Sequence, residues 1–340
     1  MINVGVIGLG MMGATHLDYY TGCDDVRIVA ISDAEPRRLS GEVLAKGNIE
    51  GQSAGGFDIR GADVKRYDEG RKLIRNKQIE LVDICLPTPL HVPFARSALR
   101  AGKHVMLEKP VGRTYRDAAK LVDAAANAST YTMVGMCMRF WPGWTWLKRA
   151  VDDRTYGTVK AATFRRVSSH PGGAFYLDGE ACGGALLDLH VHDVDFIYHL
   201  FGLPNSVSSV GYSTITSEID HIVTRYEYDD VPVVTAEGSW ALAEGFRFSM
   251  HYTVNFERAT AVFAYDAAQP LTLYEPGAAP RAVDIEPGAG YDHELVYFLD
   301  CIRNGTPPTI VTVADAAVSI KIAECERKSV LTHRPVKVKM

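Results

Sequence analysis

The stretch Asn3–Gly13, NVGVIGLGMMG, decides the fold of this 340-residue chain. Its first five residues form a short apolar run with β-branched side chains, which predicts a buried strand. A glycine turn follows at once, and residues 14–20 are compatible with a helix. Gly8 permits the tight turn, Gly10 lets a pyrophosphate approach the backbone, and Gly13 lets helix and strand pack closely. We therefore predict a strand–turn–helix unit that binds a dinucleotide through Gly8, Gly10, Met11, Met12 and Gly13.

The second predicted strand, Val26–Ser32, ends at Asp33, twenty residues beyond Gly13. A carboxylate at this spacing binds the ribose hydroxyls in dinucleotide folds. It favours NAD over NADP, because it repels a 2′-phosphate. Arg37 and Arg38 follow closely enough to soften that preference, so NADP stays possible. A plain helix cap is the alternative role of Asp33.

Beyond Asp33 the chain alternates between predicted strands and helices. Strands are expected at 64–67, 81–86, 103–107 and 131–136, and helices at 92–101 and 114–127. Continuous apolar runs such as LVDICL indicate strands that are buried on both faces of a parallel sheet. The glycine-rich and polar residues 47–62 indicate an inserted loop, to which we assign no function.

Two turns of this half carry candidate ligand-binding residues, because ligands bind at the carboxyl ends of parallel strands. Thr88 and His91 follow one predicted strand, although His91 could equally serve only to begin the next helix. Glu108 and Lys109 follow the next strand, which places a lysine beside the expected nicotinamide. A lysine without this position would be assigned to the solvated surface.

The pattern changes after residue 136 to long strands in which polar and apolar residues alternate, as in HIVTRYEY. Alternation of this kind predicts a mostly antiparallel sheet. Helices are expected at 144–152, 185–201, 292–304 and 314–332. The fold class is therefore α/β, with a Rossmann domain at 1–136 and an α+β domain with a large open sheet at 137–340. These helices are too few to cover both sheet faces, so we expect self-association through the bare face; a solvated face is the alternative.

Composition bounds the class of protein. Hydrophobic residues make up 47% and charged residues 23%, as in ordinary soluble globular proteins. The net charge of −5 argues against nucleic-acid and anionic-membrane partners. The six cysteines form no CxxC pair, the N-terminus lacks the basic region of a signal peptide, and no apolar run reaches membrane-span length. We expect a cytoplasmic protein that acts on a small molecule.

The stretch Gly183–Asp195, GGALLDLHVHDVD, is rich in groups that bind metals or transfer protons. If residues 185–201 form one α-helix, a turn of 100° per residue places four side chains on one stripe: Asp188, His192, Asp195 and His199. His190 falls on the other side and is predicted to be a core histidine. The two histidines therefore do not converge, and we expect no metal. Asp188 and His192 remain as a pair that can face one small molecule, with His192 able to remove a hydroxyl proton.

Four motifs together resemble the Gfo/Idh/MocA oxidoreductase family: the N-terminal GxGxxG, Glu108-Lys109-Pro110, Arg139-Phe140 and GGALLDLHVHDVD. The resemblance covers nearly the whole chain. It implies a Rossmann domain followed by an α/β domain whose large open sheet often forms dimers or tetramers.

The same resemblance implies roles for single residues. Lys109 matches the active-site lysine of the family, Asp188 its substrate-orienting aspartate and His192 its general base. Arg139 and Thr88 match positions that line the site. Further substrate contacts are expected from two loops that carry the residues Trp141, His170 and Tyr176, because aromatic faces suit sugar C–H surfaces; such residues could also only anchor the loops.

These observations predict an NAD(P)-dependent dehydrogenase that acts on a secondary hydroxyl of a sugar, a cyclitol or a derivative. Two alternatives stay open at this point. The first keeps NAD tightly bound and oxidises the substrate only transiently, to cleave a glycosidic bond by elimination or hydrolysis. The second is a non-catalytic NAD-binding sensor, which would have no need of Lys109, Asp188 and His192 together.

Overall fold

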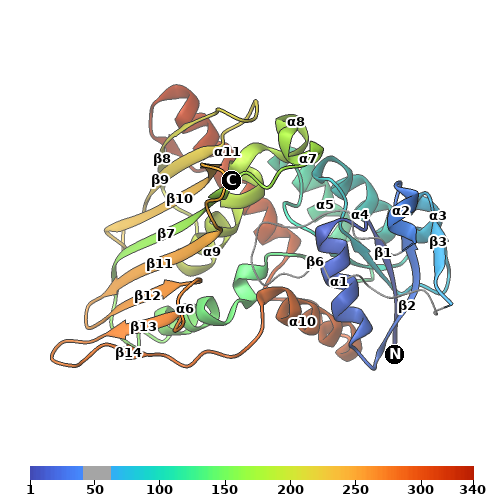
Figure 1. The fold of residues 1–340 in the computed structure, drawn as a ribbon, viewed down its shortest axis with the longest axis horizontal. Helices are drawn as coiled ribbons and strands as arrows, with labels where there is room; N and C mark the ends of the chain where they lie inside the picture. Colours follow the sequence, from blue (N-terminus) through green and yellow to red (C-terminus); the bar gives the residue numbers. More distant parts are fainter. Residues whose placement is uncertain (41–62) are drawn as a thin grey trace. The chain divides into compact units, whose positions relative to one another are not determined.

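A computed structural model describes residues 1–40 and 63–340 of the chain (Figure 1). The residues form two compact units. Unit 1 comprises Met1–Met136 and Tyr291–Ala317, and unit 2 comprises Cys137–Gly290 and Val318–Met340. The loop expected at residues 47–62 lies outside the described residues.

Unit 1 contains a parallel sheet of six strands in the order β3-β2-β1-β4-β5-β6. The strands are β1 (Ile2–Ile7), β2 (Val26–Ser32), β3 (Lys65–Tyr67), β4 (Leu81–Ile84), β5 (His104–Leu107) and β6 (Thr132–Val134). The apolar runs explain why β4 is wholly buried. The strand order reverses direction between β1 and β4, which is the point where doubly wound sheets open a ligand crevice at the carboxyl ends of their strands.

Most helices of unit 1 connect these strands, and α10 comes from the later part of the chain. They are α1 (Met11–Thr21), α2 (Pro36–Leu39), α3 (Gly70–Ile74), the 3₁₀ turn η1 (Thr88–Leu90), α4 (His91–Arg100) and α5 (Tyr115–Ala126), together with α10 (Gly290–Asn304), whose first residue belongs to unit 2. Helix α4 contacts both α3 and α5. Thr114 caps α5 by accepting a hydrogen bond from the N–H of Asp117 (3.1 Å), and Gly102 follows α4 in the left-handed conformation (φ 70°).

Unit 2 is organised around a nine-stranded sheet in the order β14-β13-β12-β11-β7-β10-β9-β8-β15. The strands are β7 (Val159–Ser169), β8 (Ser206–Tyr212), β9 (His221–Glu227), β10 (Val233–Leu242), β11 (Ser249–Phe256), β12 (Thr260–Ala264), β13 (Leu271–Tyr274), β14 (Arg281–Ala282) and β15 (Val336–Lys337). Neighbours pair antiparallel, as the alternation predicts, except that β7 and β10 are parallel.

One face of this sheet packs against helices. These are the turn η2 (Cys137–Phe140), α6 (Pro142–Asp152), α7 (Ala174–Leu177), α8 (Gly179–Cys182), η3 (Leu186–His190), α9 (Val191–Phe201) and α11 (Val313–Thr332), which begins in unit 1. Trp144 of α6 is fully buried at the centre of the packing. Its ring centroid lies 4.7 Å from that of Phe196 on α9 and 5.4 Å from that of Tyr252 on β11. Aromatic contacts thus join helices and sheet into one core.

The other face of the sheet carries side chains that point away from the core. In β9 the residues alternate, so that Ile222 and Thr224 are buried while Val223 between them is 38% exposed. Its partner across the strand pair is Val210 of β8, which is 66% exposed. Within unit 2 this face therefore presents apolar side chains to solvent.

Candidate functional site

The glycine turn between β1 and α1 has the geometry expected of a phosphate-binding turn. Gly8 has a φ of +90°, and a Cβ there would lie 2.4 Å from the carbonyl oxygen of Cys85. A Cβ at Gly13 would lie 1.9 Å from the carbonyl oxygen of Gly8, so helix and turn can only meet at a glycine. A Cβ at Gly10 would meet nothing within 4 Å. The open space at Gly10, before the first turn of α1, fits the close approach of a pyrophosphate.

Asp33 lies directly after β2 and is 8% exposed. Its Oδ2 accepts a hydrogen bond from the N–H of Leu9 (2.7 Å), and its Oδ1 accepts one from the N–H of Glu35 (2.8 Å). Nη1 of Arg38 lies 3.5 Å from Oδ2. Asp33 therefore holds the glycine turn against the end of β2, at the edge where ribose recognition is expected. Arg37, on α2, is exposed, and Met11 and Met12 open α1 half-buried.

His91 is the first residue of α4 and is buried. Its Nδ1 lies 2.7 Å from the carbonyl oxygen of Pro110, and its Nε2 lies 2.6 Å from that of Leu86. Burial lowers the pKa of His91 although both carbonyls act in the opposite direction. A neutral ring carries one N–H, so it donates to one carbonyl at a time. Both ring nitrogens of His91 face backbone carbonyls, so the side chain links the turn after β4 to the turn after β5. Any contact of His91 with a cofactor would therefore involve its ring carbons.

The turn after β5 carries Glu108, which is buried, and Lys109, which is half-buried. Oε2 of Glu108 accepts a hydrogen bond from the backbone N–H of Lys109 (3.0 Å). This bond fixes the backbone at the start of the Lys109-Pro110 peptide, which is cis. Thr88, in the preceding turn, is also buried.

A buried cluster that the sequence analysis did not find lies behind this turn. Nδ1 of His16 is 2.8 Å from Oδ2 of Asp83, which also accepts a hydrogen bond from the hydroxyl of Tyr20 (2.8 Å). Nε2 of the same ring is 3.2 Å from Oε1 of Glu108. Glu294 of α10 is fully buried near them, and its oxygens have no hydrogen-bond partner within the described residues. Asp83 is a charged residue within the apolar run LVDICL, and this position is the sequence feature that could have indicated a buried polar cluster.

The titratable groups of this cluster lie close enough to change one another's pKa. His16, Glu108 and Glu294 place possible ligand atoms within 4.8 Å of one another, as do His16, Asp83 and Cys85. Burial alone would lower the pKa of His16, but the charge of Asp83 and the hydrogen bond to it raise that pKa well above its ordinary value. Burial, followed by the charge of Glu108, raises the pKa of Glu294. These shifts favour protonated forms of His16 and Glu294 in the folded protein.

In unit 2, the stretch predicted as one α-helix divides into two segments. Residues Leu186–His190 form the π-helical turn η3, and α9 begins at Val191. A π turn contains more residues than an α turn, so counting 100° per residue is wrong across η3. Asp188 lies on η3 and is half-buried. His192 lies in the first turn of α9, is 8% exposed, and has its Nδ1 3.9 Å from Sγ of Cys137.

The other carboxylates of this stretch are committed to buried arginines. Nε of Arg166 donates to Oδ2 of Asp193 at 2.8 Å. Asp195 is held by Arg139 through two hydrogen bonds, Nε to Oδ2 at 2.8 Å and Nη2 to Oδ1 at 2.7 Å, and by the Ser319 hydroxyl at 2.9 Å. Asp195 is thus part of the core, which corrects its expected place on an open stripe with Asp188.

His190 is fully buried. Its Nε2 lies 3.3 Å from Oε1 of Glu326 on α11 and 3.3 Å from the hydroxyl of Tyr226 on β9. Gly238 of β10 provides the space for it, since a Cβ at that position would lie 2.6 Å from Cβ and Nδ1 of His190. These contacts agree with a core position.

Of the further residues expected to contact the substrate, Arg139 and Trp141 are buried, while His170 and Tyr176 are half-buried. Arg139 is 5% and Trp141 9% exposed. Nε2 of His170 lies 3.3 Å from the carbonyl oxygen of Tyr176, and its ring centroid lies 5.1 Å from that of Trp240. Tyr176 also packs against the buried cluster formed by Cys182, Ala185 and Trp240. His170 and Tyr176 therefore anchor the loop that precedes the stretch with Asp188.

Two known protein domains match the chain. The family described as "Oxidoreductase family, NAD-binding Rossmann fold" matches residues 2–136, and the "GFO/IDH/MocA C-terminal domain" matches residues 144–262. The chain belongs to the Gfo/Idh/MocA oxidoreductase family. Its cofactor is NAD, as the family description and the glycine turn indicate together.

Relatives within the Gfo/Idh/MocA family differ in the reactions that their names state. The chain is 24% identical to the myo-inositol 2-dehydrogenase of Thermotoga maritima, over 99% of this chain and 98% of that protein. It is 25% identical to the 2,7-anhydro-N-acetylneuraminate hydratase of Escherichia coli, over 75% of this chain and 65% of that protein. A solved structure of levoglucosan dehydrogenase with NADH and levoglucosan superposes with a TM-score of 0.85 at 21% identity and covers 100% of both chains. The superposition confirms the fold.

Proposed function

We propose that this Gfo/Idh/MocA protein oxidises a secondary hydroxyl of a sugar, a cyclitol or a derivative and transfers the hydride to NAD. The observation that carries the proposal is the difference in environment among the three carboxylates near His192. Asp193 and Asp195 are neutralised by buried arginines, whereas Asp188 is half-buried four residues before His192. The names of the inositol and levoglucosan dehydrogenases support the substrate class.

In the proposed reaction His192 accepts the hydroxyl proton, because a histidine titrates near neutrality. Asp188 orients His192 or a neighbouring hydroxyl of the substrate, and Lys109 stabilises the negative charge that develops on the oxygen. NAD supplies the hydride acceptor.

We assign the cofactor contacts to the two turns and the end of β2 in unit 1. The glycines leave open backbone at Gly10 for the pyrophosphate, and Asp33 is placed for the ribose; a second use of NADP would depend on Arg37 and Arg38. The proposed cofactor residues are Gly8, Gly10, Met11, Met12, Gly13, Asp33, Arg37, Thr88, His91, Glu108 and Lys109. The cofactor thus belongs to the domain at 1–136 and the substrate to the domain at 137–340.

The remaining substrate contacts are assigned to Trp141, His170, Tyr176 and Arg139. The packing of these side chains favours limited roles. Trp141, His170 and Tyr176 would offer ring edges, and Arg139 would act mainly through Asp195, because its guanidinium already binds that carboxylate.

The proposal is tested with a panel of inositols, anhydrosugars and aldoses, followed by NADH absorbance and product chromatography. On a substrate that the wild type oxidises, we expect His192→Ala and Lys109→Ala to lower kcat by about 100-fold or more while NAD binding is retained. His251→Asn, which changes a half-buried histidine of strand β11, is the matched control and should keep wild-type rates. Wild-type turnover in both His192→Ala and Lys109→Ala would refute the assignment.

A reaction without net NADH formation is the second candidate. The observation that favours it is the hydratase among the relatives, which is 25% identical to this chain, while the inositol dehydrogenase is 24% identical. Products that form without NADH in the same panel would select this candidate. A protein that binds NAD and converts nothing in the panel would instead fit the sensor role.

We further propose that two or four copies associate through the exposed face of the nine-stranded sheet. The exposure of Val210 and Val223, which are cross-strand partners, supports this. Analytical ultracentrifugation should find a dimer or tetramer, and the double change Val210→Lys/Val223→Lys should shift it toward the monomer. A monomeric wild type would exclude the proposal.

Residence in the cytoplasm is also a proposal. No helix among residues 1–40 and 63–340 is long and apolar enough to cross a membrane. All six cysteines are free thiols, four of them buried, which suits a reducing compartment. Cell fractionation with a specific antibody tests the location.

A further inference from the structure

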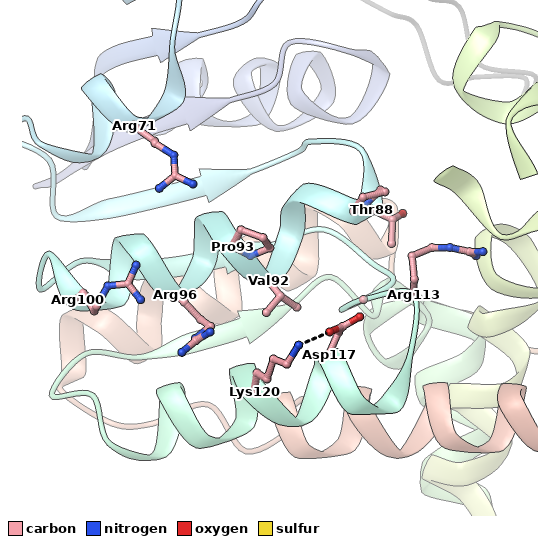
Figure 2. Close-up of a pocket in the computed structure, with 11 residues that line it drawn as sticks. Arg71, Thr88, Val92, Pro93, Arg96, Arg100, Arg113, Asp117 and Lys120 are labelled. Carbon is pink, nitrogen blue, oxygen red and sulfur yellow. Dashed lines mark hydrogen bonds and ion pairs between the residues drawn. The ribbon is translucent and has the colours of Figure 1, made fainter. Parts of the chain in front are cut away.

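A pocket of about 420 Å³ lies along α4 and α5 in unit 1 (Figure 2). Cationic side chains from α3, α4, α5 and the turn before α5 line it, together with proline and valine side chains. Its lining comprises Arg71, Thr88, Pro89, Val92, Pro93, Arg96, Arg100, Gly112, Arg113, Asp117 and Lys120. Five of these residues are basic and one is acidic, in a chain whose net charge is −5. The positive charge is therefore a local feature and does not follow from the overall composition.

The one carboxylate of the lining is already bound. Oδ1 of Asp117 accepts a hydrogen bond from Nζ of Lys120 (2.6 Å), and Oδ2 accepts one from the Thr114 hydroxyl (3.0 Å). Figure 2 shows the Asp117–Lys120 pair at one side of the pocket, on α5. The pair cancels its own charge, so the arginines determine the potential inside the pocket.

Arg96 and Arg100 lie one helical turn apart on α4, on the side of the pocket. Nε of Arg96 is buried and has no hydrogen-bond partner in the part of the chain that the structure describes. Over the same residues no carboxylate forms an ion pair with Arg71, Arg96 or Arg100. The guanidinium of Arg71 instead lies 5.3 Å from the centre of the Phe94 ring. A buried guanidinium N–H without an acceptor is costly, and a bound anion would satisfy it.

We propose that this pocket binds a small polyanion that carries phosphate groups. The planar donors of a guanidinium match two phosphate oxygens at once, which makes arginine clusters selective for such ligands. The volume of about 420 Å³ is in the range of small-molecule pockets. The pocket is distinct from the glycine turn: it includes none of the residues 8–13, and Thr88 at its rim is the one residue that it shares with the proposed cofactor contacts.

Calorimetric titration with inorganic pyrophosphate, at constant ionic strength and with NAD⁺ at saturation, tests the proposal. We expect one binding site in the wild type and an affinity lower by at least about tenfold in Arg96→Gln/Arg100→Gln, since each charge-assisted contact is worth about a factor of ten. Arg27→Gln removes one positive charge from an exposed position outside the pocket, as Arg100→Gln removes one from its lining, and should bind as the wild type does. If the double variant has a lower melting temperature than the wild type, Arg100→Gln alone replaces it in the titration. Arg100 is exposed, and we expect a smaller loss of pyrophosphate affinity from this single change.

Parallel titrations with orthophosphate and succinate distinguish a phosphate site from a general anion site. Stronger binding of pyrophosphate than of succinate supports the proposal. It is overturned if the wild type binds no pyrophosphate under NAD⁺ saturation, if Arg27→Gln loses as much affinity as the double variant, or if succinate binds equally well. None of these readouts requires enzymatic turnover, so the result stands apart from the assignment of a dehydrogenase.

Discussion

Arg139 and Asp195 form a buried two-pronged ion pair that fastens the turn η2 to helix α9. Their side chains are 3% and 1% exposed, and both hydrogen bonds are shorter than 2.9 Å. His192 lies one turn before Asp195 on the same helix. The pair therefore fixes the helix that carries the proposed base, and Arg139 acts as a positioning residue.

Breaking this pair should destabilise the protein strongly. In Asp195→Asn the guanidinium of Arg139 stays buried without its counter-charge, so we expect the free energy of unfolding to fall by about 3–5 kcal/mol. Urea denaturation followed by tryptophan fluorescence measures the loss. Asp230→Asn, at an exposed position, is the control and should change stability by less than about 0.5 kcal/mol. An Asp195→Asn protein as stable as the wild type would show that the pair carries no net stability.

The space that Gly238 leaves for His190 predicts a second stability effect. Gly238→Ala would place a methyl group 2.6 Å from His190, and overpacking of this kind costs about 1–3 kcal/mol. Gly22→Ala is a matched control, because Gly22 has a φ of −85° and its nearest neighbour to an added Cβ is 3.4 Å away. Thermal denaturation should separate the two variants. Equal melting temperatures would mean that His190 shifts freely under β10.

The second and third glycines of the turn, Gly10 and Gly13, should separate cofactor binding from folding. Gly10 has a φ of −71° and open space at its Cβ, so Gly10→Ala should fold normally but bind NAD at least about tenfold more weakly, because the methyl group occupies the approach of the pyrophosphate. Gly13→Ala should lower the melting temperature even without NAD, since its methyl group would overlap the carbonyl oxygen of Gly8. Calorimetry and thermal denaturation of the apoprotein test both. Unchanged NAD affinity in Gly10→Ala would show that the pyrophosphate does not bind beside Gly10.

Glu294 should make stability depend on pH. Its folded-state pKa is raised, above all by burial, so the folded protein keeps a proton that the unfolded chain releases above a pH of about 4.3. Stability therefore falls as pH rises from that value toward the folded pKa, by at most about 1.4 kcal/mol per pH unit from this group. Glu294→Gln should flatten the decline that begins above a pH of about 4.3, whereas exposed Glu286→Gln should not. Parallel curves for wild type and Glu294→Gln, measured by urea denaturation, would contradict this.

Local patterns predicted the fold well because they report local constraints. The GxGxxG turn, the buried run LVDICL and the alternation of HIVTRYEY each fix an element within about ten residues. The first two belong to the six-stranded parallel sheet, and HIVTRYEY forms β9 of the nine-stranded sheet. The parallel pairing of β7 with β10 joins segments about 70 residues apart, and alternation carries no signal for it.

The candidate site was less predictable, because contacts between residues distant in the chain determine it and local patterns do not report such contacts. Asp188, Asp193 and Asp195 look alike in sequence, and only Arg166 and Arg139, far away in the chain, distinguish the buried acids from the half-buried one. The π turn η3 leaves no compositional trace, yet it changes the faces on which its residues lie. The cluster of His16 with Glu294 joins residues near opposite ends of the chain, and neither belongs to a motif.

The discontinuity of unit 1 has a consequence for biosynthesis. The ribosome releases residues 1–136 long before Tyr291–Ala317, yet both segments belong to the same compact unit. Until α10 emerges, the nascent chain lacks Glu294, which completes the cluster around His16, and Arg303, which forms an ion pair with Asp25. Residues 1–136 can therefore complete their unit only after residues 137–290, which contain eight of the nine strands of the unit 2 sheet, have been translated. A fragment that ends at residue 136 would lack Tyr291–Ala317.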